Sequence, residues 1–593
     1  MMKRFFISML GSLAAIWISV SLLALLGLIG VISLVSIAVH EDKGPVIKNN
    51  SILYINLSTT LSELGQKLVI EDVINGEKTD VTVLHKAVKA IEKAESDNRI
   101  RGIVLDARGG INGGIASLRW LKKALNHFRQ NTDKWILAYG DQITQGTYYI
   151  ATSADEIFIN PQGMLDVHGL SASIFFYKEL LDKIGVEMQV LKVGTFKSAV
   201  EPYVLDSISD ANRLQTREYL SVLWDDIAQS IAHDRNLTMD SLNEIADSML
   251  LTVPAERLVE LGLIDKVCYR HEFDDEIRQR VNVDNGEKLP YVSLKHYSED
   301  IKEWEGGRSS NKIAVVYAIG EITESGKDGI TSDALVPRIL NLAEDDDIRG
   351  LVMRVNSPGG SAFASEQIWE ALEQFKNAGK TYYVSMGDVA ASGGYYISCN
   401  ADKIYASPVT LTGSIGVFGL IPNVKVLMNN HLGINVSTVN TNENSDFPAI
   451  TSPMTPFQQA SMQKMIERGY ETFVDRCSKG RGISVDSIKS IAEGRVWAGI
   501  TAKEIGLVDN FGTLDDAIDA LVSELNLREY EVEVFPKSKF SFWDIIESMN
   551  GSVSSAIMRC VLGDECYELY RKSMCLRHLE PIQCRMEDSE IRL

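Results

Sequence analysis

Apolar and polar positions follow the same order in the two halves of this chain. Strand-like apolar runs begin the halves at residues 51–57 and 312–317, and shorter buried-type runs follow at residues 103–105 and 351–353. The segments between these runs carry apolar residues three and four positions apart, which is the spacing of an amphipathic helix. Strands and helices that alternate at this length predict βαβ units with a mainly parallel sheet. The sequence therefore predicts an α/β fold.

The halves are also related residue by residue, at a spacing of 247 positions (154 to 401). Residues 154–161 read Ala-Asp-Glu-Ile-Phe-Ile-Asn-Pro, and residues 401–408 read Ala-Asp-Lys-Ile-Tyr-Ala-Ser-Pro. The same spacing relates apolar residues at helical positions, which are Leu121, Leu125 and Phe128 in the first half and Ile368, Leu372 and Phe375 in the second. Self-similarity over this length indicates an internal repeat, with two tandem βαβ domains.

The two copies differ at residues that could carry chemistry. At the repeat spacing Ser414 corresponds to Val167, and Lys197 corresponds to Asn444. One half thus has a hydroxyl group and the other an amine. A nucleophile and a base divided between duplicated domains predict one composite active site.

The N-terminus predicts a membrane anchor. Lys3 and Arg4 precede an almost uninterrupted apolar run at residues 5–39. This run exceeds the ~20 apolar residues that a transmembrane helix needs, and it also exceeds the ~7–15 residues of a signal-peptide core. An uncleaved helix is favoured, although Ser-Ile-Ala at residues 36–38 leaves cleavage open. Positive charge stays cytoplasmic, so the catalytic domains are expected on the extracytoplasmic side.

These patterns divide the chain into an anchor and stalk (1–45), a first repeat (46–292), a linker (293–311), a second repeat (312–527) and a C-terminal tail (528–593) of unknown role. Residues after 527 have no counterpart in the first half at the sequence level. Gly306 and Gly307 interrupt any periodicity in the linker.

Seven cysteines allow few conclusions. Cys268, Cys399 and Cys477 lie among apolar or helical residues and are predicted to be small core residues. The other four crowd the tail, where a disulfide is open: Cys560, Cys566, Cys575 and Cys584. The tail has none of the close Cys-x2–4-Cys pairs of a zinc site, so no metal is predicted.

Composition and charge limit the function classes. The 593 residues are too many for one core, and 45% hydrophobic with 23% charged residues is ordinary for globular domains. The formal net charge of -21 repels phosphate backbones, so no nucleic-acid partner is predicted.

Two turns and one lysine contain the candidate catalytic groups. Ser414 lies in the glycine-lined turn Thr-Gly-Ser-Ile-Gly, where a hydroxyl can stand exposed. Gly359 and Gly360 end a strand before a helix, and backbone N–H groups there can stabilise an oxyanion. Lys197 lies among apolar and small residues, and burial would lower its pKa enough for a general base. A histidine base, His431 or His168, is the alternative.

Taken together, residues 193–203, 354–366, 390–397, 411–419 and 494–497 resemble the long, duplicated form of signal peptide peptidase A, also called protease IV. The resemblance extends from the anchor to about residue 509. It implies a membrane-anchored serine protease with a Ser-Lys dyad, a fold similar to Clp protease and crotonase, and no cofactor. The family's serine falls on Ser414 and its lysine on Lys197.

The resemblance also implies substrates and an assembly. These would be cleaved signal peptides and other short apolar peptides, cut on the periplasmic side of the cytoplasmic (inner) membrane, by a bowl-shaped homotetramer. Likeness to Clp protease makes Ser392, in Ala-Ala-Ser-Gly-Gly, a second candidate nucleophile. Two other function classes stay open: a crotonase-type acyl-CoA enzyme, which uses a similar Gly-Gly turn, and an inactive membrane scaffold. An extracytoplasmic location argues against the first, and the presence of both Ser414 and Lys197 argues against the second.

Overall fold

The computed structural model describes residues 17–19, 22, 47–65, 81–299, 301, 304, 309–326, 329–536, 582–586 and 590–592. The predicted anchor and stalk at residues 1–45 lie outside this part, apart from 17–19 and 22, and so do Cys560, Cys566 and Cys575. Within the described ranges, no helix combines the length and apolar character needed to cross a membrane.

The first repeat is built on a parallel sheet. Its strand order is β10 (Tyr291–Ser293), β1 (Ser51–Asn56), β4 (Ile100–Asp106), β5 (Trp135–Ile143), β6 (Glu156–Leu165) and β9 (Lys266–Val267), and all neighbours run parallel. This is the arrangement predicted from the alternation of strands and helices.

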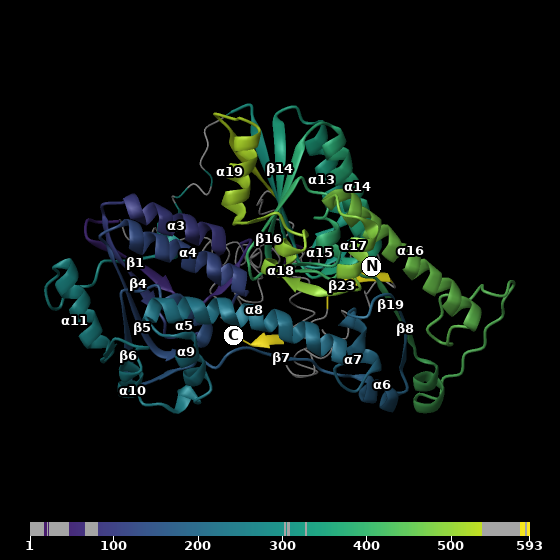
Figure 1. Cartoon of the computed structure of the whole chain (residues 1–593), viewed down its shortest axis with the longest axis horizontal. Coiled ribbons are helices and arrows are strands. Elements are labelled where there is room, and N and C mark those ends of the chain that lie inside the picture. Colours follow the sequence, from purple (N-terminus) through teal and green to yellow (C-terminus); the bar gives the residue numbers. More distant parts are fainter. Residues whose placement is uncertain are drawn as a thin grey trace, which may run out of the picture.

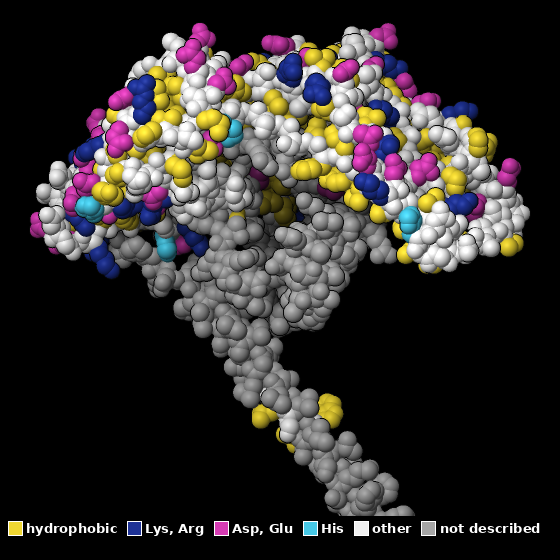
Figure 2. All heavy atoms as spheres, turned by 90° about the horizontal axis from the view of Figure 1, so that it is seen from below, with side chains coloured by type: hydrophobic (Ala, Val, Ile, Leu, Met, Phe, Trp, Pro, Cys, Tyr) yellow, Lys and Arg dark blue, Asp and Glu magenta, His cyan; other side chains and the backbone are white. Residues whose placement is uncertain are grey.

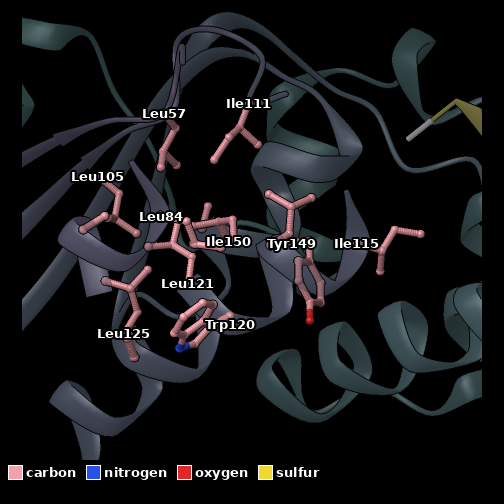
Figure 3. Close-up of a cluster of buried hydrophobic side chains, with 14 of the residues drawn as sticks. Leu57, Leu84, Leu105, Ile111, Ile115, Trp120, Leu121, Leu125, Tyr149 and Ile150 are labelled. Atoms are coloured by element: carbon pink, nitrogen blue, oxygen red, sulfur yellow. The ribbon is translucent and has the colours of Figure 1, made fainter. Parts of the chain in front are cut away.

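The core of this repeat lies between the sheet and two helices, α3 (Leu84–Ser96) and α4 (Ile115–Asn131). Figure 3 shows side chains from these helices, the strands and α5 (Gln145–Ala151) gathered in one cluster. The predicted helical apolar residues are buried in both repeats, at 0–2% exposure: Leu121, Leu125, Phe128, Ile368, Leu372 and Phe375. The 3.6-residue period thus identified the buried face correctly.

The second repeat has an equivalent sheet. Its order is β20 (Val496–Ala498), β18 (Leu411–Gly413), β16 (Thr381–Ala391), β14 (Ile348–Ser357), β11 (Lys312–Ile319) and β22 (Glu531–Phe535). β17 (Lys403–Ala406) pairs with β16, and β21 (Asn510–Phe511) pairs with β17. α13 (Ser332–Glu344) and α14 (Ala362–Asn377) pack together, and α19 (Leu514–Glu524) contacts β14 and β16 (Figure 1).

The repeats extend further along the chain than the sequence pattern indicated. β22 pairs in parallel with β11 as β10 pairs with β1, so residues beyond 527 do have a counterpart in the first half. The predicted linker also contributes to the first repeat, because it contains α12 (Leu294–Glu299), which contacts α3 and β1. Strands this short carry too few residues for sequence similarity to be visible.

A further sheet joins the repeats. Its order is β13 (Ile330–Thr331), β12 (Ile322–Thr323), β15 (Gly359–Ser361), β23 (Ile582–Arg585), β19 (Phe418–Asn423) and β8 (Glu187–Lys192). β8 belongs to the first repeat and pairs antiparallel with β19 of the second. The chain's C-terminal segment supplies β23, which lies between β15 and β19. This sheet therefore brings both repeats and the tail to one place.

Buried polar contacts fix the two repeats against each other. Arg354 of the second repeat donates to Glu63 of the first, at 2.6 Å, and both side chains are 5% exposed. Asp388 accepts hydrogen bonds from the backbone N–H and the hydroxyl of Ser117, in the first turn of α4. Such pairs are costly to break, so they specify one relative placement of the repeats.

Each repeat also carries a long helix late in its sequence. α8 (Asp210–Arg235) begins after Ser209, and α16 (Pro456–Arg481) begins after Thr455; both caps accept a hydrogen bond from the helix. Seen from below, the molecule is hollowed near its centre, and hydrophobic side chains are visible in the hollow (Figure 2).

Candidate active site

Lys197 reaches from the first repeat into the second. It follows β8 and lies immediately before a short 3-10 turn at Ser198–Val200. Its side chain is 1% exposed. Its Nζ lies 3.1 Å from Ser414 Oγ, 2.8 Å from Ser392 Oγ and 3.3 Å from the carbonyl oxygen of Ser414. The hydroxyl groups of both candidate serines therefore lie within hydrogen-bond distance of the predicted lysine.

The two serines have unusual backbone conformations. Ser414 follows β18 with φ of 51°, and its N–H donates to the carbonyl oxygen of Arg495 at 2.7 Å. Ser392 caps α15 (Gly393–Tyr396) with φ of 56°, and its N–H donates to Gly413 O at 2.8 Å. Non-glycine residues at positive φ cost free energy and cluster at functional sites. Both hydroxyls lie within hydrogen-bond distance of Lys197 Nζ.

Burial controls the charge of Lys197. Removal from water disfavours the ammonium ion and lowers the pKa of Lys197 from 10.5 to about 7. No described carboxylate forms an ion pair with Lys197, so nothing in this part of the chain holds the proton strongly. A large neutral fraction near pH 7 is what a general base requires.

The second repeat and α8 hold the lysine loop in place. Gln215, on α8, donates to the carbonyl oxygen of Phe196 and accepts the N–H of Val496, each within 3.2 Å. Phe196 N–H donates to the carbonyl oxygen of Glu493 at 2.9 Å. Gly494 has φ of 79°, and a Cβ there would lie 2.7 Å from the backbone nitrogen of Lys197. The backbone of residues 493–496 is thus in direct contact with the lysine loop.

The predicted oxyanion turn lies beside α15, the short helix that Ser392 caps. Gly359 and Gly360 have φ of 103° and 154°, conformations that favour glycine. Gly359 N–H donates to Ser357 Oγ at 3.1 Å. A Cβ on Gly359 would collide with the carbonyl oxygen of Cys584 and lie 2.7 Å from the nitrogen of Gly393. Glycine at this position lets the carbonyl oxygen of Cys584 lie close to the turn.

Between β15 and β19 is a cleft, the catalytic cleft, and the chain's own tail occupies it. β23 pairs antiparallel with β15 on one side, Cys584 opposite Gly360, and with β19 on the other, Gln583 opposite Phe418. Cys584 is fully buried, and burial raises the pKa of its thiol to about 12. Ile582 and Cys584 line a mainly apolar hollow of about 590 Å³. The arrangement is that of an extended peptide with alternate side chains facing one pocket.

The other candidates lie apart from this chemistry. His431 is exposed at the end of a helical turn at Leu427–His431, and the Nδ1 atom of His168 lies 2.9 Å from Asp166. Cys268, Cys399 and Cys477 are buried, as predicted for core residues. No group of three or more metal-binding side chains is found among the described residues.

Sequence reasoning assigned no role to three parts of the site: Gln215, Gly494 and β23. Gly494 belongs to a segment of the family resemblance, residues 494–497, but its contact with the lysine loop was not predicted. Gln215 has no local signal, because its role depends on packing between α8 and β20. β23 comes from a segment for which the sequence suggested no partner.

Comparisons with known proteins agree with these features. The sequence profile of peptidase family S49 matches residues 128–284 and 374–528, once in each repeat, and that of Clp protease matches residues 315–410. Protease 4 of Haemophilus influenzae is 34% identical over 82% of this chain and 81% of its own length. Protease 4 of Salmonella typhi is 34% identical over 81% and 78%. A chloroplastic serine protease, SPPA, of Arabidopsis thaliana is 29% identical over 78% and 69%.

Proposed function

Because the chain belongs to peptidase family S49 and is a serine protease homologous to protease 4, we propose that Ser414 is its nucleophile and Lys197 its general base. One observation carries this assignment: a fully buried lysine Nζ lies 3.1 Å from Ser414 Oγ. Hydrogen-bond distance between nucleophile and base is the geometric requirement for covalent catalysis. Ser392, at 2.8 Å from the same Nζ, then orients the lysine.

The reaction follows from these positions. Neutral Lys197 takes the proton of Ser414 as Oγ bonds to the peptide carbonyl carbon, and the carbonyl oxygen becomes an oxyanion. Backbone N–H groups near Gly359 and Gly360 stabilise that charge. When the C–N bond breaks, the lysine ammonium protonates the leaving amine. Lys197 then deprotonates a water molecule, which hydrolyses the acyl-enzyme and restores Ser414.

The substrate in this proposal is a peptide in an extended conformation, bound where β23 lies. Pairing with β15 and β19 gives affinity without regard to sequence, and the adjacent hollow selects side chains. This hollow is lined mainly by apolar groups, among them Phe363, Val417, Ile421, Met462 and Met465. Apolar peptides, including cleaved signal peptides, fit such a lining.

We further propose that residues 5–39 anchor the enzyme in the cytoplasmic membrane with its catalytic domains outside, and that it assembles as a homotetramer. The length of the apolar run and the position of Lys3 and Arg4 support the first part. Family resemblance alone supports the second.

A serine-directed covalent probe tests the assignment. The full-length protein is treated with a fluorophosphonate and digested, and the labelled peptide is identified by mass spectrometry. Label on the peptide containing Ser414, lost in Ser414→Ala and kept in Ser392→Ala, is the expected result. Label on Ser392 instead would transfer the nucleophile's role to that residue.

A further inference from the structure

The first repeat keeps the peptide-binding strand of the second, although it lacks the serine. At the 247-residue repeat spacing, β7 (Ser171–Ser173) is equivalent to the first three residues of β19. β19 pairs antiparallel with β23, and β7 pairs antiparallel with β24 (Glu590–Arg592). Figure 1 shows the two yellow C-terminal strands at separate places, β23 near β19 and the other beside β7 under α8. One tail thus contacts equivalent strands of both repeats.

In both pairings an isoleucine of the tail lies opposite the same repeat position. In the second repeat Gly419 lies opposite Ile582. In the first, the equivalent residue Ala172 lies opposite Ile591. Because both pairings are antiparallel and use equivalent residues, β7 and β19 can each pair with an extended chain.

A side pocket accompanies the strand in each repeat. A hollow of about 520 Å³ lies between β7 and α8, and Ala172 is part of its lining. It corresponds to the hollow beside β19, since Leu170 and Ile174 of one occupy the repeat positions of Val417 and Ile421 in the other. The duplicated fold has therefore kept both the pairing edge and its pocket.

The two pockets differ in charge. The lining of the first-repeat hollow includes Arg213, Arg217 and His168, but no aspartate or glutamate. Both arginines are exposed on α8, and neither forms an ion pair with any residue in the described ranges. Two guanidinium groups four positions apart on one helix, neither paired with a described carboxylate, in a chain of net charge -21, are suited to bind a carboxylate.

At the repeat positions of the two serines, the first repeat has no hydroxyl group. Val167 stands at the position of Ser414. Gln145 stands at the position of Ser392, and its side chain bonds the N–H groups of His168 and Gly169. In the first repeat these hydrogen bonds occupy the turn that follows Val167. The equivalent turn of the second repeat carries Ser414.

We propose that β7 and the adjacent hollow, the β7 site, form a second peptide-binding site, which holds a carboxylate-bearing segment C-terminal to the segment in the catalytic cleft. The tail sets the spacing, because Ile582 lies opposite Gly419, Ile591 lies opposite Ala172, and the two isoleucines are nine positions apart. A peptide of about twelve residues can therefore occupy both sites. The identity of this ligand as a substrate rests on the proposed function, whereas its binding does not.

Binding without turnover tests the β7 site. The full-length protein carrying Ser414→Ala is titrated with two fluorescent peptides, one with the sequence of residues 582–593 and one with that of residues 582–586. The long peptide should bind roughly tenfold more tightly. Arg213→Ala with Arg217→Ala should weaken the long peptide roughly fivefold and leave the short one unchanged. Arg101→Ala, an exposed first-repeat arginine outside the hollow, is the matched control.

Three further measurements test the role of β24 and identify the carboxylate that is bound. Ile591→Pro removes an N–H from the resident β24 strand, so it should strengthen binding of the long peptide only. Amidating the long peptide's terminus, or replacing its Glu590 by Gln, identifies which carboxylate is bound. Equal affinity of the long and short peptides, or no loss from either neutralised carboxylate, would overturn the proposal. Cleavage of the short peptide is measured separately in the unmodified enzyme, so an inactive dyad and an absent β7 site give different results.

Discussion

Lys197 and Ser414 are 217 positions apart in the chain, yet Nζ and Oγ lie 3.1 Å from each other. Neither repeat contains the pair by itself. The lysine is delivered by the loop after β8, and the serine by the turn after β18, so the distance depends on how the repeats pack. Residues at that interface therefore influence activity through the position of the lysine.

Replacing Ser414 by alanine should reduce kcat for a fluorogenic apolar peptide by roughly 10⁴-fold or more, because the nucleophile is lost. Ser392→Ala should lower kcat more modestly, since it removes only one hydrogen bond that orients Lys197. Circular dichroism of both variants controls for folding. Full activity in Ser414→Ala, with loss in Ser392→Ala, would reverse the assignment.

The pH profile should report the buried amine. Only neutral Lys197 accepts the proton of Ser414, and its pKa is lowered to about 7 by burial. We expect kcat/KM to fall about tenfold per pH unit below that value and to level off above it. A profile measured at constant ionic strength from pH 5 to 9 tests this. A plateau extending down to pH 5 would exclude Lys197 as the base.

Lys197→Met should abolish turnover and yet stabilise the fold. The unfolded lysine titrates near 10.5 and the folded one near 7, so the unfolded state binds more protons between these values. The resulting penalty on folding is complete below about pH 7 and vanishes above about 10.5. Methionine removes this penalty, so the free energy of unfolding at pH 7 should rise by roughly 1–3 kcal/mol. Urea denaturation measures the change. Lys197→Arg, which keeps the charge, should be inactive and less stable.

Gly494 should be required for the geometry of the lysine loop. Gly494→Ala places a Cβ 2.7 Å from the backbone of Lys197 at a positive φ, so we expect a loss of roughly 3 kcal/mol in stability and a large decrease in kcat. Gly482→Ala is the matched control. It has φ of 64° but no atom within 4 Å of its Cβ, so it should cost only about 1 kcal/mol. Equal effects of the two substitutions would show that contact with Lys197 is unimportant.

Release of β23 should activate the enzyme toward added peptide. Because β23 lies in the cleft, only the fraction of molecules with an open cleft can bind a substrate, and the apparent affinity falls by that fraction. Gln583→Pro removes an N–H from the middle of β23, so we expect a lower KM, by roughly tenfold, with kcat little changed. Gln583→Ala keeps the backbone donor and should lower KM by much less. An unaltered KM in Gln583→Pro would mean that β23 does not compete with substrate.

Much of this protein could be predicted from the sequence because the relevant signals are local or repeated. Periodicity identified the buried faces of α4 and α14, and the 247-residue spacing identified two domains of one fold. The difference at Ser414 and Val167 indicated which repeat carries the hydroxyl. A glycine-lined turn and a lysine among apolar residues were visible as types of residue, although each alone is common.

Tertiary structure decided what depends on contacts between distant segments. The pKa of Lys197 falls because packing of both repeats excludes water, and no local pattern encodes that burial. Gln215 and Gly494 act only through the segments against which they pack. The tail had no recognisable role, since pairing of β23 and β24 uses backbone groups that every residue carries. Sequence therefore determined the elements and the reactive groups, whereas the free energy of packing determined which groups meet.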